Sequence, residues 1–467
     1  MPSLTGSGRL RRRNATPVSR HGLLVAAFVA IAMIFGGGGS PSPKAEIIVQ
    51  LGFVAALLAW VWWAPRGNED VLQPVPHRLA LLGSMLLFVP TLQLLLLPPQ
   101  IWQSLPGREL QVASLSLVDG ANSWQPLSIS PARTLAGLLA LMPAVAVMWA
   151  TARLPSRDRR FLILLIALLS IAGAVLGALQ LASGGASFYL YEISHRGWLT
   201  AFHANRNAAV DVLLIGSLAM SAFFASKATP PALLRRRMPV LLAGQAVLLL
   251  AAILTGSRMG VLLILPVLAL NAVILKPLGE GRALKLAGRV ASFGVILLLA
   301  LPLILAGNPR LAAVATRFDA AGDARIMLWR DTLQAIDAFF PVGSGVGTFP
   351  VAFAPHQSFE SLSAAFINRA HNDFLEFFLE AGLLAPVVLL AGGYLLLRQG
   401  FSTWSQAASE RAPQIFACGT LGVIALHSLV DYPLRNMAIA CLAGVAAGML
   451  SPTQPMREAN RDADRDR

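Results

Sequence analysis

The sequence predicts an all-α, polytopic membrane protein with about 12 transmembrane helices. Of its 467 residues, 56% are hydrophobic and only 13% are charged, whereas a soluble globular chain carries about 25% charged residues. The apolar residues gather into runs close to the length of about 20 residues that crosses a bilayer. Such a chain cannot cover itself with a polar surface, which excludes a soluble enzyme, a disulfide-rich secreted domain and a coiled coil.

The apolar runs define the individual helices in chain order. The first run follows an arginine-rich N-terminus without a small-x-small cleavage site, so we expect a membrane span there and not a signal peptide. The twelve predicted helices lie near residues 22–36, 46–64, 79–98, 134–152, 161–182, 208–225, 240–256, 260–275, 290–307, 381–397, 414–430 and 437–450.

The net charge of +14 would suggest a nucleic-acid partner if the protein were soluble. The loops between the predicted helices fall into two alternating sets, and 25 of the 37 basic residues lie in the set that contains both termini. The other set is much longer yet holds only 12. Basic residues mark cytoplasmic loops. We therefore expect both termini in the cytoplasm and the long loops outside, and no nucleic-acid partner.

The first outer motif, Asn205-Arg206-Asn207, opens the sixth predicted helix. Asp211 shares a helix face with Asn207, four residues earlier. A carboxylate in the membrane is costly without a partner, so Asp211 should face the interior of the bundle. The motif is compatible with a packing network or with an arginine that neighbouring amides hold at the mouth of a cavity.

Two predicted helices then meet in a short turn, Thr255-Gly256-Ser257-Arg258-Met259-Gly260. An arginine at such a place can simply extend to the membrane surface. The glycines, however, permit close approach of backbone to a ligand, and Ser257 adds a hydroxyl group beside Arg258. A guanidinium binds phosphate oxygens in pairs, so the turn is suited to a phosphate or diphosphate.

The longest outer loop, 308–380, contains two predicted helices. In the first, Arg325, Trp329 and Ile336 form one stripe, with Leu328, Thr332 and Leu333 beside it, which predicts an amphipathic helix with Arg325 near its buried side. A glycine-rich turn, 343–347, follows it. Because this turn follows a helix and not a strand, it is not a dinucleotide-binding motif.

The second helix of the loop is predicted over 369–382. His371 is expected in its first turn, where free backbone N–H groups favour an anion, and Asn372, Glu376 and Glu380 lie on one polar face. A neutral histidine can accept a proton from a hydroxyl group, although a lone histidine is more often structural. No second His or Cys stands at metal-ligand spacing, so no metal site is expected.

Near the end of the eleventh predicted helix, His427 and Asp431 are four residues apart. This spacing predicts an ion pair or a hydrogen bond between the two side chains that closes the hairpin.

Taken in order, these motifs resemble those of the O-antigen ligase and O-antigen polymerase superfamily. The resemblance covers about residues 200 to 450, and the first 200 residues match only as a series of spans. It rests on Asn205-Arg206-Asn207, Ser257-Arg258, Arg325 with Leu328-Trp329, Pro341-x-Gly343-x-Gly345-x-Gly347, Ala370-His371-Asn372-Asp373-x-x-x-Glu376-x-x-x-Glu380-x-Gly382, and His427-Ser428-x-x-Asp431-Tyr432-Pro433-Leu434.

The resemblance implies a GT-C-like glycosyltransferase of the bacterial inner membrane. Such an enzyme moves a glycan from undecaprenyl diphosphate to an acceptor hydroxyl at the periplasmic face, with inversion at C1 and without a metal or cofactor. Arg258 and Arg325 would be catalytic residues that stabilise the diphosphate, and His371 would activate the acceptor. The residues expected to bind substrate are Asn205, Arg206, Asn207, Ser257, Arg369, Asn372 and Glu376.

The resemblance also divides the chain into N-terminal transmembrane helices (1–200), a ligase-like core that includes the periplasmic loop (201–450) and a cytoplasmic tail (451–467). The acceptor could be lipid A core, the growing polysaccharide or a protein such as pilin, and we favour a ligase or a polymerase. The expected partners are the lipid-linked glycan, an acceptor glycan or lipid A core, and membrane lipids.

An alternative of another class is a secondary transporter or a flippase of lipid-linked glycans. Transporters commonly show paired repeats and broken helices at mid-membrane. No internal repeat is visible here, and the polar residues gather at the outer ends of the predicted spans. This distribution favours chemistry at the membrane surface over passage through it.

Overall fold

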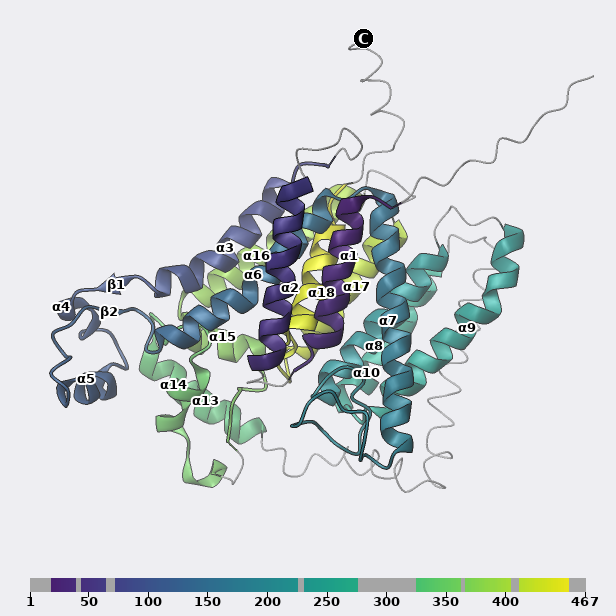
Figure 1. Ribbon diagram of the computed structural model, residues 1–467. Helices are drawn as coiled ribbons and strands as arrows, with labels where there is room; N and C mark the ends of the chain where they lie inside the picture. Colours follow the sequence, from purple (N-terminus) through teal and green to yellow (C-terminus); the bar gives the residue numbers. More distant parts are fainter. Residues whose placement is uncertain are drawn as a thin grey trace, which may run out of the picture.

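The protein is almost entirely helical (Figure 1). The computed structural model describes residues 18–38, 43–63, 72–225, 231–275, 325–362, 366–404 and 411–452. The predicted span at 290–307 and the first part of the long loop lie outside the described residues. Within the described ranges, only two short strands occur, Leu96–Leu97 (β1) and Gln125–Pro126 (β2), which pair antiparallel.

Eleven helices coincide with predicted spans. They are α1 (Arg20–Phe35), α2 (Pro43–Trp63), α3 (His77–Gln93), α6 (Pro131–Arg153), α7 (Ser156–Ala182), α8 (Arg206–Ala225), α9 (Pro231–Leu254), α10 (Arg258–Leu275), α16 (Leu384–Trp404), α17 (Arg411–His427) and α18 (Met437–Met449). In the described part of the chain, 6 helices are long and apolar enough to cross a membrane. The protein is thus an all-α, multi-pass membrane protein.

The outer segments form the remaining elements. The loop after α3 carries α4 (Pro99–Trp102) and α5 (Glu109–Ser116), and the long loop carries α13 (Arg325–Phe339), α14 (Phe349–Phe353) and α15 (Asp373–Ala381). Short 3-10 turns lie at Ala354–His356 (η2), Phe359–Ser361 (η3) and Pro433–Arg435 (η5). In Figure 1, α13, α14 and α15 lie together below the ends of α3, α6 and α16.

Helix α8 is the centre of the bundle, with 94% of its most apolar window buried. It packs against α7, α9, α10 and α17. Buried hydrogen bonds join it to its neighbours: Ser217 Oγ donates to Gln245 Oε1 of α9 (2.6 Å), and Asn271 Nδ2 of α10 donates to Ser217 Oγ (2.8 Å). Polar bonds of this kind hold helices together where the surroundings are apolar.

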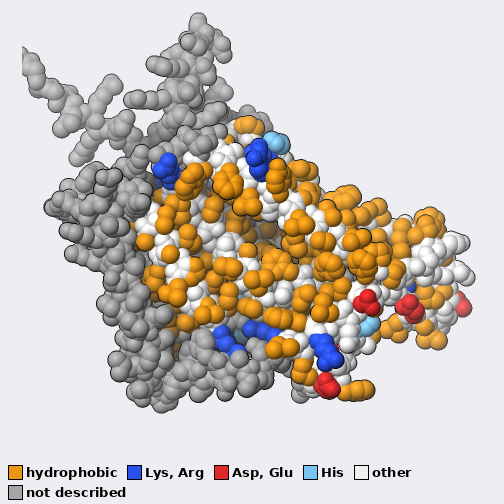
Figure 2. Space-filling view, turned by 180° about the vertical axis from the view of Figure 1, so that it is seen from behind, with side chains coloured by type: hydrophobic (Ala, Val, Ile, Leu, Met, Phe, Trp, Pro, Cys, Tyr) orange, Lys and Arg blue, Asp and Glu red, His pale blue; other side chains and the backbone are white. Residues whose placement is uncertain are grey.

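The surface of the bundle is apolar, as expected for contact with lipid. Figure 2 shows hydrophobic side chains across the middle of one face and basic side chains near its upper and lower margins. Helix α2 lies at the periphery, with 11% of its window buried. Exposed Leu58 and Trp62 of α2 therefore face outward from the bundle.

Two sequence predictions about helix boundaries and faces need correction. The third span was expected to reach residue 98, but α3 ends at Gln93, and the chain then pairs with β2. In α13 the buried face contains Leu328 and Thr332 as expected, whereas Leu333 is 55% exposed. Ala335 and Phe339 continue the buried stripe, because the face of α13 that carries them packs against the hydrophobic core of the long loop.

The glycine-rich turn after α13 fastens the long loop to α15. Gly343 and Gly345 have φ of 84° and 115°, a region that favours glycine. A Cβ on Gly343 would lie 2.6 Å from the carbonyl oxygen of Glu380. The N–H of Gly345 donates to that carbonyl oxygen (2.9 Å), and so does Gln93 Nε2 at the end of α3 (2.8 Å). The turn thereby fixes α15 against the bundle.

Candidate active site

A cavity of about 160 Å³ lies at the outer end of the bundle, where α8, α10 and α13 begin and α17 ends. Its described lining residues include three arginines and one histidine, and none of them carries a carboxylate. The lining residues are Arg206, Asn207, Gly256, Ser257, Arg258, Met259, Arg325 and His427. Five of the residues predicted to act on the substrate's diphosphate or to bind substrate, Arg206, Asn207, Ser257, Arg258 and Arg325, therefore meet around one space.

Local helix starts position two of these arginines. Arg258 is the first residue of α10, and Ser257 Oγ accepts a hydrogen bond from the N–H of Gly260 (3.3 Å). Arg206 is the first residue of α8, and Asn205 Oδ1 accepts from the N–H of Asn207 (2.9 Å). These are N-terminal caps of the usual kind. Each cap places a guanidinium at the positive end of a helix dipole, where anions are stabilised.

The guanidinium of Arg206 stacks on an aromatic ring. Its Cζ lies 4.8 Å from the ring centroid of Trp198, a distance at which the ring's π electrons attract a cation. Nε and Nη1 of Arg206 are buried and have no hydrogen-bond partner among the described residues. Buried donors of this kind are normally paired, so these two atoms are available to an anion in the cavity.

The two glycines of the α9–α10 turn are needed for a different reason from the predicted approach of a ligand. Gly256 has φ of 65°, and a Cβ there would lie 2.3 Å from the Trp198 ring. A Cβ on Gly260 would lie 2.4 Å from Val210 of α8. Close approach is thus made by protein groups: Trp198, which stacks on Arg206, and α8, which brings Arg206 towards Arg258.

His371 does not line the cavity, but polar contacts connect it to the lining residue Asn207. Nδ1 of His371 is 3.0 Å from Oδ1 of Asp431, and the His371 side chain is 35% exposed. The other oxygen of Asp431 accepts a hydrogen bond from Asn207 Nδ2 (2.5 Å), and Asn207 lines the cavity. A continuous path of polar contacts therefore joins the cavity to His371 through Asn207 and Asp431.

The carboxylate of Asp431 is held in its ionised form. Burial raises its pKa, but the hydrogen bond and charge of His371 and the charges of His427 and Arg325 outweigh that effect and lower the pKa to about 2. Tyr432 packs edge-on against the His371 ring, with centroids 4.9 Å apart. Burial and the charge of Asp431 raise the pKa of Tyr432, so its hydroxyl stays protonated beside the histidine.

The sequence suggested that His371 lies in the first turn of a helix, but in the structure it precedes the helix. Helix α15 begins at Asp373, and Asn372 Oδ1 caps it by accepting from the N–H groups of Phe374 and Leu375 (3.0 and 3.1 Å). The free N–H groups are thus used within the protein. His371 precedes the cap in the left-handed region (φ 50°), an uncommon conformation for a side chain other than glycine, which turns it towards Asp431.

The predicted pair between His427 and Asp431 is wrong. His427 Nδ1 lies 2.6 Å from Oδ1 of Asp211, and both side chains are buried. Asp211 thus has the partner that its place in a membrane span requires. His427 and Asp431 are joined through the backbone, where the N–H of Asp431 donates to the carbonyl oxygen of His427 (2.9 Å), while the side chain of Asp431 contacts His371.

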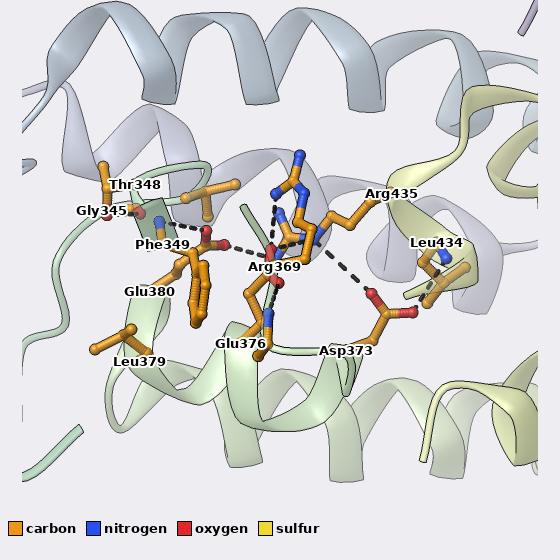
Figure 3. Close-up of polar contacts among 12 residues, drawn as sticks. Gly345, Thr348, Phe349, Arg369, Asp373, Glu376, Leu379, Glu380, Leu434 and Arg435 are labelled. Atoms are coloured by element: carbon orange, nitrogen blue, oxygen red, sulfur yellow. Dashed lines mark hydrogen bonds and ion pairs between the residues drawn. The ribbon is translucent and has the colours of Figure 1, made fainter. Parts of the chain in front are cut away.

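The acidic face of α15 is occupied by ion pairs (Figure 3). Glu376 binds Arg369 (2.7 Å) and Arg435 (3.2 Å), and Glu380 binds Arg435 (2.6 Å). Burial raises the pKa of Glu376, but the charges of Arg435 and Arg369 lower it overall. None of these side chains is among the residues that line the cavity. The substrate-binding roles of Arg369, Asn372 and Glu376 stay predictions.

Among the three acids of this cluster, Asp373 has the weakest contacts to offset the cost of burying its charge. Its Oδ2 accepts from Ser428 Oγ (2.9 Å) and the N–H of Leu434 (3.1 Å), while Oδ1 lies 3.9 Å from Nε of Arg435. Burial raises its pKa to about 7 despite the charge of Arg435. The cluster holds three carboxyl groups and two arginines, so one carboxyl group keeps a proton at mildly acidic pH.

Two important contacts were not predicted, that of Asp431 with His371 and that of Trp198 with Arg206. The pairing of Asp431 depends on the fold, because His371 is 60 residues away. Trp198 gave a clearer signal, since an aromatic residue eight positions before an arginine in the same outer loop is a candidate for stacking. In the described ranges, no group of three or more His, Cys, Asp or Glu side chains could hold a metal ion.

Comparison with known protein families agrees with this geometry. The sequence model of the family described as O-antigen ligase matches residues 243–390, a stretch that contains Arg258, Arg325 and His371. A search of curated proteins finds no match. This match supports the relationship to the O-antigen ligase/polymerase superfamily that the order of the motifs suggested.

Proposed function

We propose that the protein transfers a glycan from undecaprenyl diphosphate to an acceptor hydroxyl at the periplasmic face of the bacterial inner membrane. The observation that carries this proposal is a cavity whose described lining has three arginines, connected through Asn207 and Asp431 to His371. A diphosphate is the group of a lipid-linked glycan that such a cavity suits, because guanidinium groups bind its oxygens in pairs.

In the proposed reaction the diphosphate occupies the cavity among Arg206, Arg258 and Arg325. Negative charge grows on its oxygen as the C1–O bond breaks, and fixed guanidinium groups stabilise that charge without rearranging. His371 accepts the proton of the acceptor hydroxyl as this oxygen attacks C1. The ionised Asp431 stabilises the imidazolium that results. One displacement inverts C1 and needs no metal, cofactor or nucleophilic carboxylate.

We place both termini in the cytoplasm and the cavity on the periplasmic side, in line with the distribution of basic residues. The acceptor is the growing polysaccharide or the lipid A core, as in a polymerase or a ligase, and we rank a protein acceptor lower. The flippase alternative finds no support in the site, because a base beside a leaving-group cavity serves bond cleavage.

The test is transfer of glycan from a purified undecaprenyl diphosphate donor by the protein in liposomes. Arg258→Ala and His371→Ala should each lose at least about 100-fold in rate. Arg196→Ala is the matched control, because Arg196 stacks on Tyr189 (5.7 Å) and does not line the cavity. Full activity of both site variants would contradict the assignment, and movement of intact donor across the bilayer would favour a flippase.

The acceptor class is decided by a deletion strain. A ligase deletion should accumulate complete glycan on the lipid carrier, whereas a polymerase deletion should accumulate single repeat units. Complete glycan on the carrier with normal lipopolysaccharide would instead point to a protein acceptor.

A further inference from the structure

A second histidine–carboxylate pair lies on the wall of the arginine-lined cavity. His427 lines the cavity, whereas Asp211, which is 2.6 Å from its Nδ1, does not. The ring therefore binds the carboxylate with one nitrogen and presents its other side, which carries Nε2, to the cavity. Nothing in the proposed displacement uses this pair. Its burial in the bundle is costly, which calls for a function.

We propose that His427, held by Asp211, is the acid that protonates the departing diphosphate. This inference rests on the proposed transferase function and adds a second proton-transfer residue to it. When Nδ1–H of His427 donates to Asp211, Nε2 carries a hydrogen only in the imidazolium form. The nearby carboxylate stabilises that form, so the ring can present an N–H donor to an anion.

The proton balance of the step closes without any further reactant. The acceptor oxygen forms its bond to C1 and gives its proton to His371. The C1–O bond to the diphosphate breaks, its electron pair stays on the phosphate oxygen, and that oxygen takes the proton from Nε2 of His427. His427 is left neutral and His371 is left protonated. Before the next turnover, His371, which is 35% exposed, releases its proton to water, and Nε2 of His427 takes one up from water in the cavity.

The two pairs are neighbours at the outer end of the bundle. Asp211 and Asp431, their carboxylates, line the same small cavity of about 20 Å³. Asn207, which also lines this cavity, holds Asp431 in place (2.5 Å).

The charged groups around His427 connect its protonation to the bound substrate. Asp211 of α8 is 2.6 Å from its Nδ1, and Arg206, Arg258 and Arg325 line the same cavity as the ring. A diphosphate bound among these arginines brings negative charge next to His427, and negative charge favours the imidazolium form.

The experiment is the pH dependence of kcat for the full-length protein in liposomes with an undecaprenyl diphosphate donor. The wild type should give a bell-shaped profile, with a low-pH limb because His371 must be neutral and a high-pH limb because His427 must be protonated. His427→Gln should lower kcat by roughly 100-fold and remove the high-pH limb. Asp211→Asn should move that limb to lower pH.

Thr420→Val is the matched control, a buried polar replacement on the same helix, α17, and it should keep the wild-type profile. Wild-type kcat with an unchanged high-pH limb in His427→Gln would overturn the inference. If that variant fails to fold, an unchanged limb in Asp211→Asn overturns it equally. Failure of the proposed function itself looks different, because the wild type would then transfer no glycan.

Discussion

Arg206, Arg258 and Arg325 lie around one cavity although their like charges repel. No Asp or Glu is among the described residues that line the cavity, so an anion that enters it meets guanidinium groups. Two donor atoms of Arg206 lack partners among the described residues. The free energy of the folded protein should therefore fall when a diphosphate enters the cavity.

This leads to a prediction that needs no turnover. Inorganic pyrophosphate should raise the melting temperature of the detergent-solubilised protein, since a ligand at 100 times its Kd stabilises by about 2.7 kcal/mol. The increase should be reduced in Arg258→Ala and retained in Arg196→Ala. An equal increase in both variants would show that pyrophosphate binds elsewhere.

Asp431 supports a second prediction at the scale of one residue. Asp431→Asn keeps the size of the side chain but removes the charge that stabilises a protonated His371. We expect kcat to fall by about 100-fold or more while KM for the donor changes little, because Asp431 does not line the larger cavity. Steady-state kinetics would check this, and a rise in KM at constant kcat would contradict it.

At the scale of single elements, the polar face of α15 connects the long loop to the end of the bundle. The face looked like a binding surface in the sequence, since Asn372, Glu376 and Glu380 repeat every four residues. In the structure Arg435, from the turn η5 after α17, pairs with both glutamates. Helical periodicity predicted which residues share the face, but Arg435, the partner that both glutamates share, comes from a segment about 55 residues from Glu380.

The excess acid of this cluster has a pH signature. The folded pKa of Asp373 is about 7, above its unfolded value near 4. As the pH rises from about 4 to about 7, the unfolded chain loses a proton that the folded protein still holds, so the free energy of unfolding falls. Asp373→Asn should make this fall smaller.

The measurement is the melting temperature in detergent between pH 4 and pH 8. The exposed Asp119 offers a control, and Asp119→Asn should keep the wild-type pH dependence. If Asp373→Asn also keeps the wild-type dependence, the excess proton does not reside on Asp373.

The junction between α15 and α16 supports a further element-scale prediction. Gly382 has φ of 55°, and a Cβ there would lie 2.1 Å from the carbonyl oxygen of Pro341. Gly382→Ala should lower the free energy of unfolding by more than about 2 kcal/mol, from backbone strain and the clash. Gly393→Ala in α16 meets nothing within 4 Å and should stabilise by up to about 1 kcal/mol. Thermal melts of the two variants compare them directly.

At the scale of the whole molecule, the alternation of basic loops predicts which end of the bundle faces the cytoplasm. His77 is the first residue of α3, and Ser104 lies after α4, beyond the C-terminal end of α3. Both residues are exposed. In a chain in which Cys418 and Cys441 are replaced by alanine, His77→Cys should react with an impermeant maleimide only after the membrane is permeabilised. Ser104→Cys should react in intact spheroplasts, and the reverse pattern would invert the topology.

The sequence predicted the parts of this molecule that depend on local composition. Apolar runs located the helices. Amide neighbours drew attention to Arg206, glycine and serine neighbours to Arg258, and an amphipathic helix to Arg325, and the fold brings these three arginines to one cavity. The sequence could not predict which side chains from distant segments pair with each other. Asp211 could be expected to have a partner, but whether His427 would bind Asp211 or Asp431 depends on how α8 and α17 pack.

The order of the site residues along the chain has a consequence for biogenesis. Arg206 and Arg258 enter the membrane early, whereas Asp431 lies in the turn before the last described helix, α18. A partly synthesised chain that ends before α17 already carries Arg206 and Arg258 but lacks Asp431. Under the proposed mechanism, the ability to cleave the donor would be acquired only at the end of insertion, so nascent chains would not consume the carrier-linked glycan.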